Sequence, residues 1–221
     1  MRLVLAAAAL LAIWPAAAHA ATCPWGAPPA ATAAGLPALG VLQIPAIGLR
    51  TRVFQGGWPG MSTESSRALM QGPAFYPQAM PWNNSLPGQG GTVGLAGHRT
   101  TRTHPFCLLG NLSAGDQAII RMRYGTFTYR LVRKLTVPAT DWGPFERPGA
   151  YDPSRRKARE YLVTATCTPP HSAADRLTAI WRLVAVAAPG RASMSRPRAA
   201  GERRSPRGDP RPHAARALEI H

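Results

Sequence analysis

The stretch that decides the fold is residues 161–183, YLVTATCTPPHSAADRLTAIWRL. Its first part is rich in β-branched and aromatic residues and runs to Cys167, after which Pro169 and Pro170 break the strand. A second strand-like run opens with Arg176. Cys167 stands at the end of one strand and Arg176 at the start of the next, so the two can lie side by side. The cysteine can then act as a nucleophile, and the guanidinium can stabilise an anion next to it. We therefore predict an enzyme whose reacting residues sit on this hairpin.

Composition limits the class of protein. The chain has 221 residues, of which 45% are hydrophobic and 16% charged, and it contains 23 Pro and 21 Gly. These values allow one core with many turns and disordered ends. The formal net charge of +16 predicts attraction to an anionic membrane or wall surface. Nucleic acid is not expected as a partner, because the chain has no groove-reading or base-stacking motif.

The first 20 residues predict export. Arg2 provides a positive start, residues 3–14 are apolar, and Ala18-His19-Ala20 is typical of a cleavage site. We expect residues 1–20 to be a signal peptide or a signal anchor. The protein would then be extracytoplasmic, at the cell surface, and either membrane-anchored or secreted and surface-associated.

The chain has three cysteines, Cys23, Cys107 and Cys167. This number is small for an exported protein that is stabilised by disulfides. A free thiol in an exported chain often has a chemical function. This favours a role for Cys167 as a nucleophile over a role as a small buried side chain. A Cys23–Cys107 bridge is compatible with the sequence, but no feature of the sequence selects it.

The elements read along the chain indicate an all-β domain. Strands are expected at 41–44, 49–55, 92–96, 117–123, 126–137 and 161–167, with another from Arg176, and short helices at 62–71 and 103–112. Strand–helix alternation is not repeated, which argues against a parallel sheet and favours a single sandwich or barrel. The expected organisation is an Ala/Pro-rich linker at 21–38, a catalytic domain at 39–187, and a basic, disordered tail at 188–221.

A free thiol is only a few per cent ionised at pH 7, so it needs a neighbouring base or cation. The candidates are His98, His104, His171, Arg99, Arg102 and Arg176. Of the imidazoles, the residues favour His98, which follows a strand, over His171, which follows the cysteine. A zinc site built from His98, His104, Cys107 and Cys167 is a weaker alternative, because the spacing matches no standard set.

Three segments together resemble the sortases, exported cysteine transpeptidases of Gram-positive bacteria, and most closely those of class E. They are LQIPAIGLRTRVFQGG at 42–57, GTVGLAGHRTTRTHPFCLLGNLSAGD at 91–116, and YLVTATCTPPHSAADRL at 161–177. The resemblance covers about 41–186. It implies a closed β-barrel of about eight strands with a few short helices and long loops.

The resemblance also assigns roles. It implies that Cys167 attacks the Thr–Gly carbonyl of an LPxTG- or LAxTG-like sorting signal, that His98 protonates the leaving amine, and that Arg176 steadies the oxyanion. An amine of a wall precursor or pilin would then resolve the thioester. Thr166, Thr100 and Thr101 would line the substrate groove, and no metal or cofactor is implied.

Two departures and two alternatives accompany this expectation. The apolar N-terminal run is shorter than the usual membrane anchor, and Gly91-Thr92 stands where Gly-Asn is expected. One alternative is a Cys-His hydrolase that releases its product to water. The other is a non-catalytic basic wall-binding β-domain, in which Cys167 is merely buried.

Overall fold

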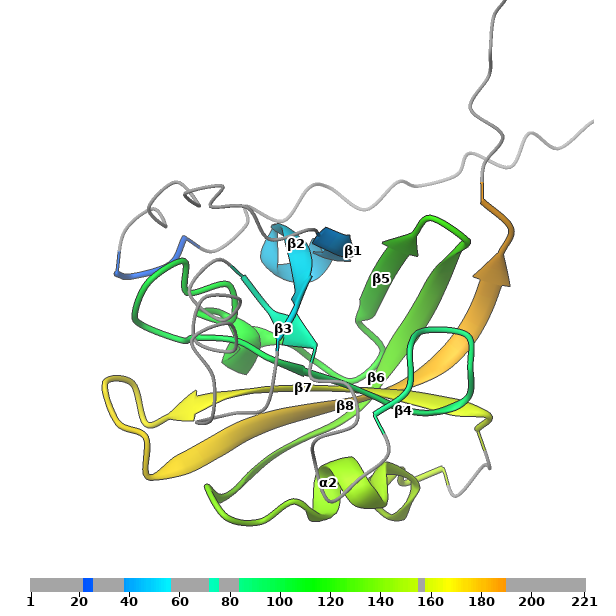
Figure 1. Cartoon of the computed structure of the whole chain (residues 1–221). Coiled ribbons are helices and arrows are strands. Elements are labelled where there is room, and N and C mark those ends of the chain that lie inside the picture. The colour runs from blue at the N-terminus through cyan, green and yellow to red at the C-terminus, as the bar shows by residue number, and fades with distance from the viewer. Residues whose placement is uncertain (1–21, 26–37, 57–71, 76–83, 155–157, 190–221) are drawn as a thin grey trace, which may run out of the picture. The chain divides into compact units, whose positions relative to one another are not determined.

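The described part of the chain is a closed β-barrel. The computed structural model describes residues 22–25, 38–56, 72–75, 84–154 and 158–189. Its strands close in the order β1-β2-β3-β4-β7-β8-β6-β5 (Figure 1). The strands are β1 (Ala38–Ile44), β2 (Leu49–Gln55), β3 (Ala74–Phe75), β4 (Gly91–Ala96), β5 (Gln117–Met122), β6 (Gly125–Pro138), β7 (Glu160–Thr168) and β8 (Asp175–Ala187). The short helical turns are η1 (Pro45–Ile47), η2 (Leu109–Asn111), α2 (Gly143–Glu146) and η3 (Pro148–Tyr151). The predicted all-β barrel of about eight strands is confirmed.

Local sequence signals explain the antiparallel corners. Between β1 and β2, Gly48 has φ 63°, a left-handed conformation that glycine adopts without strain, and its N–H donates to the Pro45 carbonyl. The β5–β6 hairpin turns after Met122, close to the predicted turn at Tyr124. On β6, Phe127, Tyr129 and Leu131 are buried in the core, as their alternation predicted.

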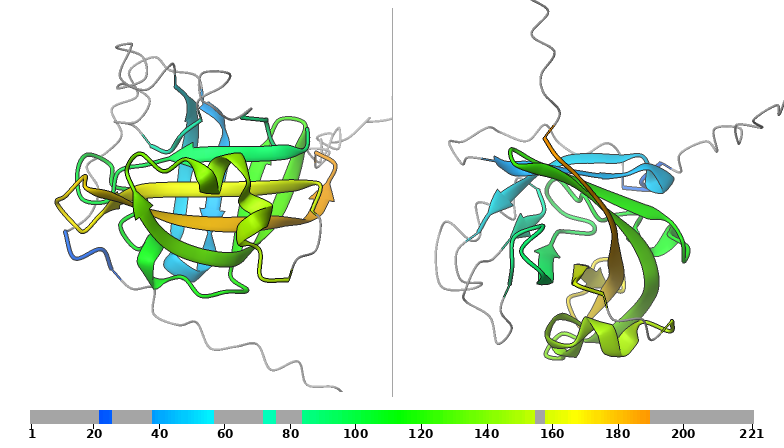
Figure 2. Two further views of the ribbon diagram at one scale, coloured as in Figure 1. Left: turned by 90° about the horizontal axis from the view of Figure 1, so that it is seen from below. Right: turned by 90° about the vertical axis from the view of Figure 1, so that its right-hand side faces the viewer.

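Strand β7 lies in the middle of the sheet and is buried on both faces. It runs parallel to β4 and antiparallel to β8. Leu162 packs in the barrel core with Trp181, whose indole N–H donates to Thr164 at 3.1 Å. Val163, on the opposite face, packs against Phe145 of α2, which covers this side of the sheet (Figures 1 and 2). β4 holds β7 as far as Ala165, and β8 continues to pair with its last residues, including Cys167.

A buried carboxylate fastens the start of β7. Glu160 is fully buried, and one of its oxygens accepts hydrogen bonds from the N–H groups of Gly88 and Gly90, both at 2.8 Å. The other oxygen accepts the hydroxyl of Tyr129 at 2.5 Å. This network joins the loop before β4 to β6 and β7 at the end of the strand opposite Cys167.

Some expectations differ from the structure or lie outside it. The helix predicted at 103–112 is wrong: the segment forms turns and ends in η2, and His104 has φ 29°, which an α-helix does not allow. The helix predicted at 62–71, the export segment at 1–20 and most of the tail at 188–221 lie outside the described residues. Among the described residues, no helix is long and apolar enough to cross a membrane.

Candidate active site

Three strands bring the predicted reacting residues to one end of the barrel. Cys167 is the next-to-last residue of β7 and pairs directly with Arg176 of β8. His98 follows β4 by two residues. Because β4 and β7 are parallel neighbours, they end on the same side, and His98 therefore comes near Cys167.

A pocket of about 260 Å³ contains both side chains. It is lined by residues of the loop after β4 and of the β7–β8 connection: His98, Arg99, Thr100, Thr101, Cys167, His171, Ser172 and Ala173. Cys167 is half-buried and is the free cysteine of the chain. The structure thus brings both imidazoles that the residues left in competition, His98 and His171, to the pocket of the thiol.

The environment of His98 favours its neutral form. Burial is the larger cause that lowers the pKa of His98 from its ordinary value of 6.5, and the positive charge of Arg102 lowers it further. A neutral imidazole can accept a proton, so it suits a group that must alternate between acid and base.

Two arginines approach the thiol differently. Arg99 lines the pocket, and its Nη1 donates to the Thr168 hydroxyl at 2.6 Å, while its buried Nε has no partner among the described residues. Arg176 lies opposite Cys167, but its Nη1 donates to the carbonyls of Ala173 and Asp175, both at 3.0 Å. Arg176 is not among the residues that line the pocket. Two cations are therefore close to the end of β7 that carries Cys167.

The three threonines expected in the groove separate into two groups. Thr100 and Thr101 line the pocket. Thr166 is buried, and its hydroxyl donates to the Gly97 carbonyl at 2.7 Å. The Gly97 N–H in turn donates to the Ala165 carbonyl at 3.0 Å. Thr166 therefore holds the segment that leads into His98 against β7, instead of lining the pocket.

Packing also fixes the loop that carries His98. The Phe106 N–H donates to the His98 carbonyl at 3.2 Å, and the Phe106 ring is fully buried. A Cβ atom at Gly97 would come within 2.6 Å of this ring. Glycine is therefore required where the chain enters the site, because a side chain would push Phe106 away from His98.

Cys107 is joined to Cys23 by a disulfide, with the two Cα atoms 6.0 Å apart. The sequence did not select this bridge, because 84 residues separate its halves. The disulfide removes Cys107 from the zinc alternative, since a thiolate would be needed as ligand. It also attaches the N-terminal segment 22–25 to the loop of His98.

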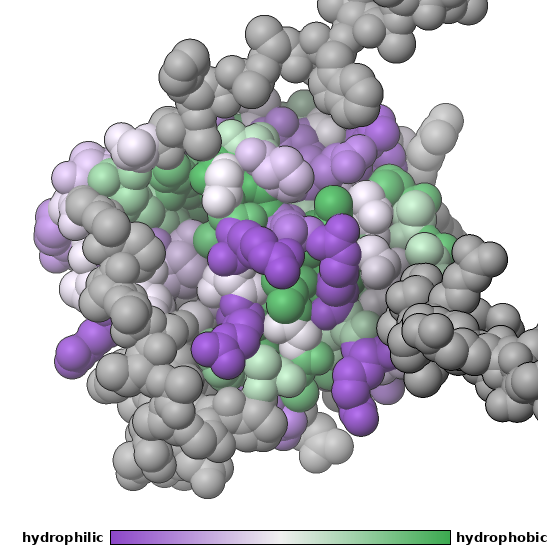
Figure 3. Space-filling model, turned by 90° about the horizontal axis from the view of Figure 1, so that it is seen from above, coloured by the Kyte–Doolittle hydropathy of each residue, from purple (hydrophilic) through white to green (hydrophobic). Residues whose placement is uncertain are grey.

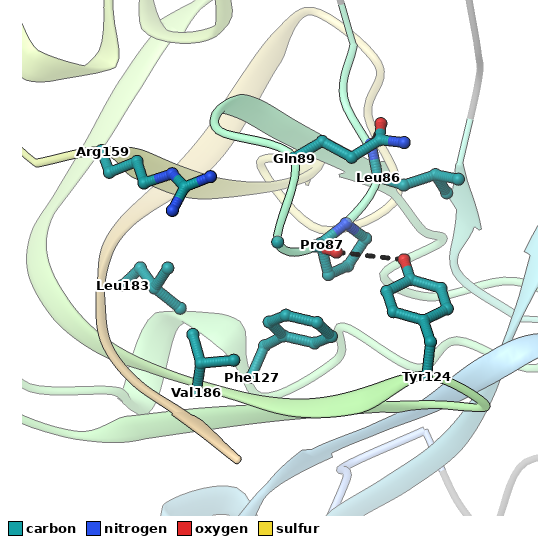
Figure 4. A pocket seen from close by; sticks show the side chains of 9 residues that line it. Leu86, Pro87, Gln89, Tyr124, Phe127, Arg159, Leu183 and Val186 are labelled. Atoms are coloured by element: carbon teal, nitrogen blue, oxygen red, sulfur yellow. Dashed lines mark hydrogen bonds between the residues drawn. The ribbon is translucent and has the colours of Figure 1, made fainter. Parts of the chain in front are cut away.

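A larger cavity lies elsewhere on the barrel. It measures about 560 Å³ and is bordered by the loop at 86–89, the β5–β6 turn and the end of β8. Figure 4 shows Phe127, Val186 and the guanidinium of Arg159 facing it, and Tyr124 donating to the Pro87 carbonyl at 3.0 Å. Its described lining includes no cysteine or histidine, so the candidate chemistry lies in the smaller pocket.

The fold and the pocket define a class: a β-barrel protein with a free thiol, an imidazole and nearby guanidinium groups at one end. Comparison with known proteins is consistent with this class. The Sortase domain family matches residues 42–187, and on this match the chain belongs to the sortase family, whose members are cell-wall sorting transpeptidases.

The individual relatives are distant. The chain is 27% identical over 112 residues to Sortase SrtE1 of Streptomyces coelicolor, covering 51% of this chain and 29% of that protein. It is 27% identical over 132 residues to Sortase D of Bacillus subtilis, covering 60% of this chain and 55% of that protein. The matches therefore span about half, or less, of the length of these relatives.

Solved structures are similar in fold. Sortase E from Streptomyces avermitilis superposes with a TM-score of 0.53 at 27% identity, covering 68% of this chain and 90% of that one. Sortase E1 from Streptomyces coelicolor, solved with a tripeptide in its active site, gives a TM-score of 0.59 at 22% identity over the same shares of the two chains. The expected resemblance to sortases, including those of class E, is confirmed.

Proposed function

We propose that this chain is an extracytoplasmic cysteine transpeptidase that cleaves an LPxTG- or LAxTG-like signal between Thr and Gly and transfers the acyl group to an amine. One observation carries the proposal: in a chain of the sortase family, the free thiol of Cys167 and the imidazole of His98 share one pocket. The pocket supplies a nucleophile and an acid–base group, and Arg176 lies across the β-ladder from the nucleophile.

In the first half-reaction, the Cys167 thiolate attacks the carbonyl carbon of the Thr–Gly bond. The S–C bond forms, and the carbonyl oxygen becomes an oxyanion. When the tetrahedral intermediate collapses, the C–N bond breaks and protonated His98 gives its proton to the leaving glycine amine. The product is a thioester between Cys167 and the threonine carbonyl.

In the second half-reaction, an amine of a wall precursor or of a pilin lysine attacks the thioester. Neutral His98 takes a proton from the attacking nitrogen, and the Cys167 thiolate leaves. The lowered pKa of His98 suits this step, because it keeps the imidazole neutral when the acceptor arrives.

Arg176 is proposed to stabilise the oxyanion. Support comes from its place directly across the β-ladder from Cys167, since opposed residues project from the same face at about 5 Å. Its guanidinium donates to the carbonyls of Ala173 and Asp175, so these bonds must loosen or be shared when it stabilises an oxyanion. Arg99 is a second donor, already within the pocket lining.

The outer surface is suited to an anionic membrane or wall. Arg52 of β2 and Arg121 of β5 both pair with Val41 of β1, and both are exposed. Arg50 of β2 is exposed as well. Figure 3 looks onto the side of β1 and β2 and shows hydrophilic side chains gathered between apolar ones. This surface would hold the enzyme near its substrates, with an N-terminal anchor or without one.

Two alternatives use the same residues. If water reaches the thioester before an amine, the enzyme is a hydrolase. If Cys167 does not react at all, the barrel is a basic wall-binding domain. None of the contacts among the described residues favours either alternative.

The test is incubation of the full chain with an LAxTG peptide and a short amine acceptor, followed by intact mass. Wild type should show a thioester adduct and an amide-joined product, and Cys167→Ala should show neither. His98→Ala and Arg176→Ala should keep the thiol and lose most turnover. Hydrolysed peptide alone in excess amine would favour the hydrolase, and absence of any adduct with LAxTG and LPxTG peptides would overturn the proposal.

A further inference from the structure

The segment Thr22–Trp25 joins the two loops that form the candidate site. Its Cys23 is covalently attached to Cys107, in the loop that follows His98. Two residues later, the ring of Trp25 meets the imidazole of His171 edge-to-face, with the ring centroids 5.6 Å apart and the planes at 79°. His171 belongs to the loop that follows Cys167. In the left view of Figure 2 the blue segment and the yellow β7–β8 connection project near each other, and the Trp25–His171 contact joins them.

The attachment at Cys107 is rigid. Cys107 is 7% exposed, and its N–H donates to the His104 carbonyl at 3.1 Å. The adjacent Phe106 is fully buried and is hydrogen-bonded to the His98 carbonyl. The disulfide therefore fixes Cys23 to a part of the barrel that cannot shift without disturbing His98.

In the loop that follows Cys167, Trp25 contacts His171, whose backbone conformation needs support from its surroundings. His171 is exposed and has φ 63°, a left-handed conformation that costs a non-glycine residue free energy unless its surroundings hold it. Within the loop, the Ser172 N–H donates to the Pro169 carbonyl at 3.0 Å and the Ala174 N–H donates to the Ser172 hydroxyl at 3.2 Å. Its far end accepts hydrogen bonds at the Ala173 and Ala174 carbonyls from Arg176 and Ala139. The Trp25 ring adds an attractive edge-to-face contact from outside the loop.

We infer that Trp25 is a positioning residue, and that the Cys23–Cys107 disulfide is the tether that keeps it in place. Trp25 does not line the pocket. It holds His171, which lines the pocket, as a fixed wall. The inference builds on the proposed function, because the group that this wall would align is the peptide of the sorting signal. Its loss should weaken peptide binding more than the chemical step.

The experiment first measures the loop without substrate. Amide hydrogen exchange at Ser172 is followed in the full chain for wild type, Trp25→Ala, Trp25→Phe and the double variant Cys23→Ser/Cys107→Ser. Exchange at Ser172 should rise roughly 3- to 10-fold in Trp25→Ala and in the double variant, the range set by the energies of edge-to-face pairs. Trp25→Phe keeps a ring and should stay near wild type. The Gly48 amide, bonded to the Pro45 carbonyl at a different corner, is the internal control.

The second measurement separates positioning from a general structural effect. With the LAxTG peptide, KM should rise in Trp25→Ala by up to the factor seen in the exchange rate, because binding weakens only as far as the competent loop is depopulated, while kcat stays within about twofold. Unchanged exchange at Ser172 in Trp25→Ala, or equal exchange in Trp25→Ala and Trp25→Phe, would overturn the inference. The exchange measurement does not depend on enzyme activity. If exchange at Ser172 is faster in Trp25→Ala but the wild-type protein forms no peptide adduct, the role of Trp25 and the disulfide is supported and the proposed transpeptidase function is overturned.

Discussion

Arg99 reaches from the loop after β4 to the last residue of β7, where its Nη1 lies 2.6 Å from the Thr168 hydroxyl. This bond joins the chain segments that carry His98 and Cys167. A hydrogen bond to a charged group contributes about 1.5–3 kcal/mol, so its loss should be measurable.

Thr168→Val should therefore lower kcat/KM by roughly tenfold or more, because the Arg99 guanidinium loses the acceptor that orients it in the pocket. The measurement is peptide turnover together with thermal unfolding. Thr136→Val, at an exposed position on β6, is the matched control and should leave both unchanged. Equal activities for the two variants would show that the bond does not order the site.

The pKa of His98 should be visible in solution. Its imidazole should titrate below 6.5 in an NMR pH series, because burial and then the charge of Arg102 disfavour the imidazolium. Arg102→Gln removes the smaller cause and should move the midpoint upward, while Arg123→Gln, at an exposed position, should not.

The same shift should appear in catalysis. If the reactive form needs a Cys167 thiolate and protonated His98, the profile of kcat/KM against pH is bell-shaped, and the group with the lower pKa, here His98, sets its acid limb. The acid limb should therefore have its midpoint below 6.5 in wild type and at a higher pH in Arg102→Gln. If the midpoint of the acid limb is the same in Arg102→Gln as in wild type, protonation of His98 does not control kcat/KM.

Glu160 should be one of the main supports of the barrel. Glu160→Ala leaves the hydroxyl of Tyr129 and the N–H groups of Gly88 and Gly90 without their acceptor. Since each unsatisfied buried group costs about 1–3 kcal/mol, we expect a loss of roughly 3 kcal/mol or more in urea unfolding. Tyr129→Phe removes one of the three bonds and should cost about 1 kcal/mol. A Glu160→Ala variant as stable as Tyr129→Phe would contradict the network.

Asp152 should make stability depend on pH in the acid range. Burial alone would raise its pKa, but hydrogen bonds from Ser154 and Tyr161 and the charge of Arg182, 3.0 Å away, outweigh burial and lower it. The folded state then holds its proton less tightly than the unfolded state. The stabilisation is present above the unfolded pKa of about 3.9 and is lost as pH falls through the lower, folded value.

The corresponding variant is Asp152→Asn. It should be less stable than wild type at pH 7, and its free energy of unfolding should fall less steeply below about pH 4. Chemical unfolding at several pH values measures both. Parallel slopes for the two proteins would assign the acid sensitivity to other carboxylates.

Gly97→Ala should damage activity, because the new methyl group would lie 2.6 Å from the Phe106 ring, next to His98. Overpacking of this kind costs about 1–3 kcal/mol, and the displaced loop should lower kcat/KM further. Gly110→Ala is the matched control, since its Cβ would meet its nearest neighbour, Arg99, at 3.6 Å. Peptide turnover and melting temperature distinguish the two, and a fully active Gly97→Ala would show that the loop tolerates the shift.

Local sequence signals predicted seven of the eight strands and the candidate reacting residues, but they missed β3, which has only two residues. Alternation and breakers placed β1, β2 and the β5–β6 hairpin correctly, and Cys167 and Arg176 stood out because a strand ends and another begins beside them. For the segment at 103–112, the same reasoning predicted a helix that the structure does not have. Its apolar residues are spaced as in a helix, but the segment forms turns. Phe106 and Leu109 both reach the core from these turns, so no helix is needed to bury them.

The sequence by itself thus predicted all strands except β3, the candidate nucleophile and the family resemblance, because these depend on residues that are neighbours in the chain. The tertiary structure alone decided that β4 and β7 are parallel partners, so that His98 and His171 both reach the pocket of Cys167. It also decided the disulfide between Cys23 and Cys107 and the contact of Trp25 with His171. Such contacts depend on how the barrel closes, and barrel closure is a cooperative property of distant segments that no local preference encodes.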